Sequence, residues 1–211
     1  MPTHAIEPSE PAALTEPGPP TDEALMLAYA SGDHRAFELL YGRHERGVFR
    51  FIARAIGRHW GDGVADELMQ ETWLSVIRQG IHYEPSARFT TWLYTIARSR
   101  VIDQVRRTRA AGGTALSLDD VGADGQTLAD TLAADENDAP LAQIETRAQA
   151  QAFFAAIDTL PGEQRITFLL QADAGLSVED IAAATGVGAE TAKSRLRYAR
   201  KRLRELLKDW L

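Results

Sequence analysis

The fold is decided by residues 177–208, which read SVEDIAAATGVGAETAKSRLRYARKRLRELLK. Ser177, followed three residues later by Asp180, is typical of a capping box at a helix start. Gly186 can end that short helix, because glycine readily adopts the left-handed conformation of a C-cap. The pattern then continues as one long helix from residue 189 to about residue 208. We therefore predict a short helix, a glycine turn and a longer helix, which together form a helix-turn-helix.

The longer of these helices separates its apolar and polar faces. One stripe is apolar and is expected to pack against the domain; it consists of Ala192, Leu196, Ala199, Leu203 and Leu206. The rest of the surface carries polar and basic side chains, namely Glu190, Thr191, Lys193, Ser194, Arg195, Arg197 and Lys201. A recognition helix needs early polar side chains for base edges in the major groove and flanking Lys or Arg for phosphates. The sequence thus favours a DNA-binding helix over an ordinary amphipathic surface helix.

The remainder of the folded chain is also predicted to be helical. Apolar residues recur at helical spacing in three stretches, around residues 37–55, 64–77 and 92–105, and a shorter helix is expected near residues 21–30. Upstream of the helix-turn-helix, Pro161 and Gly175 are placed to begin and close another helix. Because no stretch shows sustained alternation of period two, we predict an all-α protein without a sheet.

The charges are segregated along the 211 residues, whose net charge is −7. Residues 1–20 hold six of the nine prolines and no Lys or Arg, and are expected to be a disordered Pro-rich tail. The stretch 111–150 carries eight acidic residues against one Arg, so residues 111–144 are predicted to be a flexible acidic linker. By contrast, residues 98–109 contain five Arg and one acid, and residues 186–208 contain eight Lys or Arg and two acids. We therefore expect two small helical domains, 21–110 and 145–211, each with its own basic surface.

A loop and helix start rich in aromatic residues lie in the first domain, in residues 81–94, which read IHYEPSARFTTWLY. Aromatic faces can stack on unpaired bases, and a neighbouring loop can hold an extruded base. Phe89 and Trp92 could equally belong to the core, so Tyr83 and Tyr94 are the better candidates for base contact. Arg98, Arg106 and Arg109 share one face of the following helix, where they could neutralise phosphates.

Several motifs resemble those of bacterial RNA polymerase sigma factors. ADELMQETWL at residues 65–74 and FTTWLYTIAR at 89–98 are similar to their first conserved domain. LPGEQR at 160–165, GLSVEDIA at 175–182 and TAKSR at 191–195 are similar to their last domain. With two domains and no third between them, the chain resembles the extracytoplasmic-function (ECF) class of the sigma-70 family.

This resemblance implies a transcription factor that binds core RNA polymerase, directs it to promoters and helps to melt the −10 region. It assigns polymerase binding to Asp66, Gln70 and Glu71, and reading of the −35 element to the helix from Ala189 to Lys201. It assigns −10 DNA binding to Tyr83, Arg88, Trp92, Tyr94, Arg98, Arg106 and Arg109. Members of the class are often held inactive by an anti-sigma factor, so we expect such a partner as well as core polymerase and promoter DNA.

Two other classes of function remain as alternatives. A stand-alone helix-turn-helix regulator would usually dimerise, and no dimer seam is evident. An enzyme is disfavoured because the sequence shows no phosphate-cradling loop, nucleophile motif or paired metal-ligand spacing; Asp66, Glu67 and Glu71 are more simply a solvated or partner-facing acidic face. We expect no catalytic residue, metal or cofactor. With no signal peptide or membrane span in view, we expect a cytoplasmic protein.

Overall fold

The computed structural model describes residues 19–57, 60, 63–111 and 147–210. Within them every regular element is an α-helix, which confirms the all-α prediction. The N-terminal half contains α1 (Asp22–Ala30), α2 (His34–Ile56), α3 (Val64–Gly80) and α4 (Phe89–Ala110), and the C-terminal half contains α5 (Arg147–Asp158), α6 (Gly162–Ala172), α7 (Val178–Thr185) and α8 (Ala189–Leu207). The predicted tail and linker lie almost wholly outside the described residues. The helices that were predicted individually lie close to their expected positions; α5 was not predicted individually, and α6 begins after Pro161, which is its N-cap, and ends at Ala172.

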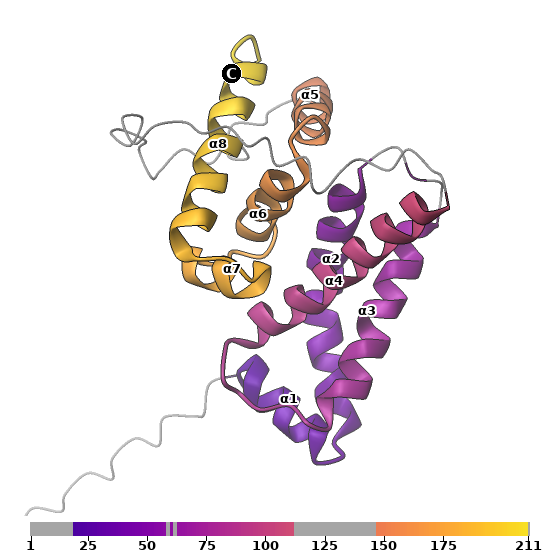
Figure 1. Cartoon of the computed structure of the whole chain (residues 1–211). Coiled ribbons are helices and arrows are strands. Elements are labelled where there is room, and N and C mark those ends of the chain that lie inside the picture. Colours follow the sequence, from indigo (N-terminus) through magenta and orange to yellow (C-terminus); the bar gives the residue numbers. More distant parts are fainter. Residues whose placement is uncertain (1–18, 58–59, 61–62, 112–146, 211) are drawn as a thin grey trace, which may run out of the picture.

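The N-terminal half is a bundle of α1 to α4 (Figure 1). Asp33 begins α2 by accepting a hydrogen bond from the Arg35 amide at 2.9 Å, which satisfies one of the free amides of the first turn. The interior is filled by apolar side chains of α2, α3 and α4 that are fully or nearly fully buried, among them Leu40, Phe51, Ile52, Leu68, Val76, Leu93 and Val101. The bundle therefore forms by burial of the predicted helical stripes.

The C-terminal half contains the predicted helix-turn-helix. Ser177 and Asp180 form the capping box at the start of α7, with the Asp180 amide donating to Ser177 Oγ at 3.1 Å. Gly186 ends α7 with φ of 70°, the left-handed conformation expected for it. One detail of the stripe on α8 was wrong: Leu207 is 3% exposed and packs inward, whereas Leu206 is 44% exposed. Leu207 lies four residues after Leu203, one turn further along the same face.

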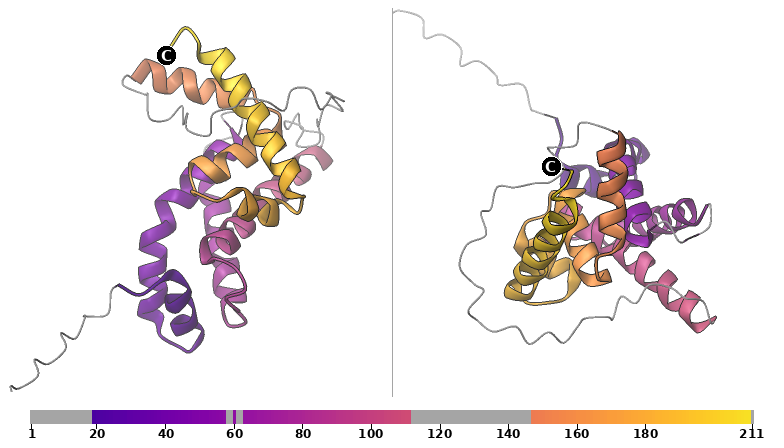
Figure 2. Two further views of the ribbon diagram at one scale, coloured as in Figure 1. Left: turned by 90° about the vertical axis from the view of Figure 1, so that its left-hand side faces the viewer. Right: turned by 90° about the horizontal axis from the view of Figure 1, so that it is seen from above.

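The two halves pack against each other, so that α7 lies against α4, and α5 and α6 lie against α2 (Figure 2). Buried residues of both halves belong to one continuous core. This packing places α4 between its own bundle and the C-terminal half. Within the residues described, no helix is both long and apolar enough to cross a membrane.

Candidate nucleic-acid interface

The start of α4 is held by a residue far away in the sequence. Arg88, the N-cap of α4, has no side-chain capping hydrogen bond of its own. Instead, the Phe89 amide donates to Glu23 Oε1 of α1 at 2.7 Å. A carboxylate suits this position, because the free amides and the dipole of a helix N-terminus favour negative charge. The role of Glu23 was not predicted from the sequence, because no local pattern relates residues separated by 66 positions.

Asp22, next to Glu23, ties α1 to α2. Its carboxylate accepts from Arg43 Nη1 at 2.7 Å and lies 2.7 Å from His44 Nε2. The same Arg43 group also donates to the Pro20 carbonyl at 2.9 Å. The loop before α4 is therefore supported by α1, and α1 in turn is held by α2.

The aromatic residues around this helix start are more buried than predicted. Tyr83 is 8% exposed, Tyr94 3% and Phe89 0%, while Trp92 is only partly buried. Tyr83 packs edge-on against Trp92, with ring centroids 5.1 Å apart, and Tyr94 packs edge-on against Phe51 at 5.4 Å. Tyr83 and Tyr94, the two residues predicted to contact bases, are therefore buried in this conformation, whereas Trp92 is partly accessible. The helical period alone could not separate a core aromatic from a surface one in a helix packed on several sides.

Burial also changes the titration of both phenols. It raises the pKa of Tyr94 to about 12, with the Asp173 carboxylate adding to the shift and Arg50 opposing it. Burial raises the pKa of Tyr83 as well, and the charges of Glu23 and Asp22 reinforce the change. Both rings therefore stay neutral at physiological pH.

Among the residues predicted to bind −10 DNA, Arg88 is exposed and lies at the end of an exposed loop.

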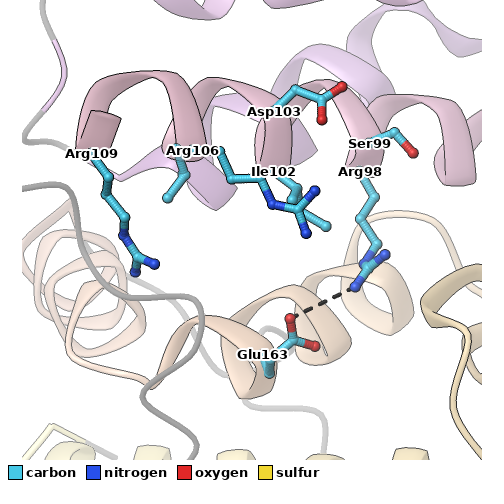
Figure 3. Close-up of a pocket in the computed structure, with 8 residues that line it drawn as sticks. Arg98, Ser99, Ile102, Asp103, Arg106, Arg109 and Glu163 are labelled. Carbon is cyan, nitrogen blue, oxygen red and sulfur yellow. Dashed lines mark ion pairs between the residues drawn. The ribbon is translucent and has the colours of Figure 1, made fainter. Parts of the chain in front are cut away.

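The arginine face of α4 lines a polar cavity of about 260 Å³. In Figure 3 the side chain of Arg98 extends from α4 to Glu163 of α6, and Asp103 points away from Glu163. Arg106 also lines the cavity, and Glu163 of α6 closes its other side. The structure thus brings together the three arginines that the helical period placed on one face. It also adds a carboxylate that the period could not predict.

The polar face of α8 is only partly open to solvent. Glu190, Thr191, Lys193 and Lys201 are exposed, whereas Ser194, Arg195 and Arg197 are half-buried. Arg195 Nη1 donates to Glu163 Oε2 at 2.8 Å, and the Arg197 guanidinium lies 5.1 Å from the ring centre of Tyr198. The start of α8 has no side-chain cap; the amides of Thr191 and Ala192 donate to the Gly188 carbonyl at 3.0 and 3.1 Å. This part of the surface has the chemistry of a duplex reader.

Glu163 is shared between the two predicted DNA-binding helices. Its Oε1 lies 3.7 Å from Arg98 Nη2 of α4, and its Oε2 accepts from Arg195 of α8. Burial lowers the pKa of the Arg98 guanidinium; Glu163 opposes this shift, and Arg195 and Arg106 reinforce it. One carboxylate therefore balances a partly buried group of like charges.

The predicted polymerase-binding residues lie on α3. Asp66 and Gln70 are exposed, while Glu71 turns toward α4, with its carboxylate 3.5 Å from Arg107 Nη2. Leu74 (48% exposed) and Ile77 (38% exposed) continue the row begun by Asp66 and Gln70, and Ile81 (63% exposed) follows directly after the helix. Leu74 and Ile77 were not among the residues predicted to bind polymerase, and Ile77 was expected on the apolar stripe of this helix, although the spacing of both residues from Gln70 indicates a shared face. An exposed apolar row beside a polar one is typical of a protein-binding surface.

Comparison with known proteins identifies the family of this chain. The model of Sigma-70 region 2 matches residues 40–111, and that of Sigma-70, region 4 matches residues 150–203. The ECF RNA polymerase sigma factor SigM of Mycobacterium tuberculosis is 33% identical over 187 residues, which cover 89% of this chain and 85% of SigM. The chain belongs to the sigma-70 family, in its extracytoplasmic-function class. It is thus a promoter-directing sigma factor, and the region 2 match disfavours a stand-alone helix-turn-helix regulator.

Other relatives agree with this assignment. RNA polymerase sigma factor CarQ of Myxococcus xanthus is 32% identical over 182 residues, covering 86% of this sigma factor and 95% of CarQ. The sigma factor RpoE of Bartonella quintana, solved with the anti-sigma factor NepR, superposes with a TM-score of 0.60 at 27% identity, over 82% of this chain and 96% of that one. CnrH, solved with the cytosolic domain of CnrY, has a TM-score of 0.63 at 22% identity, covering 90% and 99% of the two chains, and shows the shared fold.

The cluster of acids on α3 gives no sign of metal chemistry. Within the part of the chain that the structure describes, no three His, Asp or Glu side chains are grouped so that they could hold a metal ion. Asp66 and Glu67 are exposed on α3, and Glu71 lies beside Arg107 of α4.

Proposed function

We propose that three separate surfaces of the chain carry out promoter recognition. The exposed row on α3 binds core polymerase, the loop 81–88 with the arginine face of α4 handles the −10 element, and α8 reads the −35 element. The observation that supports this division most directly is the placement of basic surface on α4 and α8, with the apolar row on α3.

Polymerase binding is assigned to Asp66, Gln70, Leu74 and Ile77, with Glu71 at the margin. Burial of exposed apolar side chains by a partner removes them from water, which favours binding. The neighbouring polar side chains then determine how the partner is positioned on α3. This assignment keeps the residues predicted from sequence and adds the two apolar ones.

The −10 element is assigned to Arg88, Trp92, Arg98, Arg106 and Arg109, with Tyr83 and Tyr94 beneath them. Arginines on one helix face can hold successive phosphates, and the partly exposed Trp92 ring is the most accessible stacking surface of the aromatic group. In this arrangement the two buried tyrosines support the surface from below.

The −35 element is assigned to Glu190, Thr191, Lys193, Ser194, Arg195, Arg197 and Lys201. The exposed residues of the first turn of α8 would meet base edges, and the basic residues further along would meet phosphates. The separation of these roles predicts that first-turn variants change sequence preference while basic variants weaken binding to all sequences.

We further propose that this sigma factor performs no catalysis itself, needs no cofactor and acts in the cytoplasm, where the polymerase and the chromosome are found. An anti-sigma factor is a proposed partner, because the similar RpoE of Bartonella quintana was solved with one. We also propose that residues 21–110 and 145–211 are separate domains joined by an acidic connector.

Runoff transcription tests the proposal. Purified chain is added to core polymerase with fragmented genomic DNA, and the transcript starts are sequenced. We expect starts that depend on the chain and share −10 and −35 motifs. A matched pair of variants locates the polymerase surface: Leu74→Glu should abolish binding to core, whereas Leu206→Glu, at an equally exposed leucine of α8, should leave it intact. Chain-independent starts would contradict the proposal.

A further inference from the structure

The cavity between α4 and α6 has more positive than negative charge on its walls. Arg98, Arg106 and Arg109 of α4 line it together with two acids, Asp103 and Glu163. Asp103 is 47% exposed and points away from Glu163 (Figure 3), whereas Glu163 is only 15% exposed. The charge within the cavity is therefore set mainly by three guanidinium groups and one carboxylate.

Contacts outside the cavity hold its two walls in place. Thr91 Oγ1 of α4 donates to Asp180 Oδ1 of α7 at 2.8 Å, and Arg54 of α2 pairs with Asp173 at the end of α6. None of these four residues lines the cavity. The width of the cavity therefore does not depend on the charges that line it, and these charges can be varied one at a time.

The one carboxylate that faces the cavity is already shared between two arginines. Glu163 Oε2 accepts from Arg195 Nη1 at 2.8 Å, while Glu163 Oε1 lies 3.7 Å from Arg98 Nη2, which is too long for a hydrogen bond. Arg98 Nε is buried and has no hydrogen-bond partner in the part of the chain that the structure describes. A buried donor without an acceptor is unfavourable. Arg98 therefore has donors available to an anionic ligand.

The size and the walls of the cavity limit the ligand. Its volume of about 260 Å³ equals that of about nine water molecules at roughly 30 Å³ each, and lies below the range of about 300–1,000 Å³ that is usual for drug-sized ligands. Ile102 and the buried Val105 are among the lining residues, so part of the wall is apolar. These walls suit a small molecule that has one charged group and a short neutral body.

A phosphoryl group is the anion that suits these arginines best. It carries about 1.5–2 negative charges at pH 7 and three acceptor oxygens, and the guanidinium fork can donate two parallel hydrogen bonds to it. Burial lowers the pKa of Arg98; Glu163 opposes this shift, and the charges of Arg195 and Arg106 reinforce it. A ligand with two negative charges reduces this repulsion more than a carboxylate with one charge does.

We propose that the cavity between α4 and α6 is a binding site for a small organophosphate. Arg98, Arg106 and Arg109 hold its phosphoryl group, and Ile102 and Val105 contact its neutral body. The bound ligand occupies three of the guanidinium groups assigned above to −10 phosphates, so it competes with −10 DNA. This competition rests on the proposed function, whereas the site itself does not.

Isothermal titration calorimetry of the full chain tests the site in the absence of polymerase and DNA. Glycerol 3-phosphate should bind saturably to one site. Inorganic phosphate should bind more weakly, because it lacks the neutral body, and acetate should bind most weakly, because it carries one charge. Absence of saturable binding would overturn the site, and equal affinities for the three anions would overturn its selectivity.

Two neighbouring arginines of α4 provide a matched pair of variants. Arg106→Gln should weaken binding of glycerol 3-phosphate at least about tenfold, because a charge-assisted hydrogen bond is lost. Arg107→Gln is the control: Arg107 is also exposed, but it lies beside Glu71 of α3 and does not line the cavity. Circular dichroism verifies folding of both variants. Equal losses in the two variants would show a general attraction of anions to α4 and overturn the site.

A variant of the opposite wall tests whether the ligand lies inside the cavity. Glu163→Gln keeps the side-chain shape and removes the negative charge that faces the ligand, so it should strengthen binding at least about threefold. Unchanged or weaker binding would place the anion elsewhere on the surface.

The competition is measured separately with a fluorescent single-stranded −10 oligonucleotide bound to the chain and core polymerase. Glycerol 3-phosphate should raise the apparent Kd of the oligonucleotide for the unaltered chain. An unchanged Kd at saturating ligand would overturn the competition. Failure of the chain to direct runoff transcription would instead overturn the proposed function, and the calorimetric result would still decide whether the site exists.

Discussion

The two helices that direct arginines to Glu163 are built in different ways. Along α8, the apolar stripe is buried and the first-turn residues Glu190, Thr191 and Lys193 are exposed, as the helical period predicts. Around the start of α4, Phe89 and Tyr94 are buried, and the first amide is capped by Glu23 from another helix. The surface of α8 is set by its own sequence, whereas the surface of α4 depends on what packs around it. The proposed duplex-reading surface of α8 thus follows from its own sequence, while the aromatic group under the proposed −10 surface is part of a core.

The largest effect should follow from truncation of the α8 stripe. Leu203→Ala removes a fully buried side chain, so we expect the free energy of unfolding to fall by about 2–5 kcal/mol. Leu206→Ala, at 44% exposure, should change it by less than about 1 kcal/mol. Urea titration followed by circular dichroism measures both. Equal effects at the two positions would remove the distinction between a buried and an open side of α8.

The next effect concerns the buried ring of Tyr94. Its pKa is raised from 10.0 to about 12 by folding, so its contribution to stability is complete below pH 10 and is lost as the pH rises to about 12. Two pKa units correspond to about 2.7 kcal/mol, which is an upper limit for the extra loss between these pH values. Tyr94→Phe should remove this part of the pH dependence of the free energy of unfolding. The part that comes from titration of the lysines should remain. Parallel pH profiles for the two proteins would place the phenol in solvent, contrary to its burial.

The long-range cap of α4 is expected to contribute less. Glu23→Ala should cost about 1–2 kcal/mol, because the Phe89 amide loses its carboxylate partner. Glu38→Ala, an exposed glutamate on α2, is the matched control. Promoter melting by the polymerase complex should weaken in Glu23→Ala, whereas binding of α8 to a −35 duplex should stay unchanged. A loss in both assays would mean that Glu23 supports the whole fold and not the start of α4 alone.

The smallest effect should come from the local cap of the helix-turn-helix. Ser177→Ala should lower the free energy of unfolding by about 1 kcal/mol, since the Asp180 amide loses its acceptor. Hydrogen exchange should increase first in α7, which holds only eight residues. Thr21→Ala, at the corresponding cap of α1, provides the comparison in the other half. Faster exchange in α4 than in α7 would show that Ser177 acts mainly through the Thr91–Asp180 contact.

The parts of this molecule that could be predicted are those in which cause and effect lie within one or two helical turns. The capping box at Ser177, the C-cap at Gly186 and the arginine face of α4 all follow from spacing alone. The register error between Leu206 and Leu207 arose at a helix end, where the last turn has few neighbours to define its buried side. The burial of Tyr83 and Tyr94 could not be predicted from the sequence. In a helix that is packed on several sides, tyrosine and phenylalanine are both buried, so their spacing does not show which ring is exposed.

By itself, the sequence determined which segments are helices, where most of them begin and end, and which family the chain resembles, because caps, periodicity and motifs are local properties. Only the tertiary structure decided that Glu23 caps α4 and that Glu163 stands between Arg98 and Arg195. These contacts join residues tens of positions apart. Their energies come from burial and charge pairing in three dimensions, which no spacing along the chain encodes.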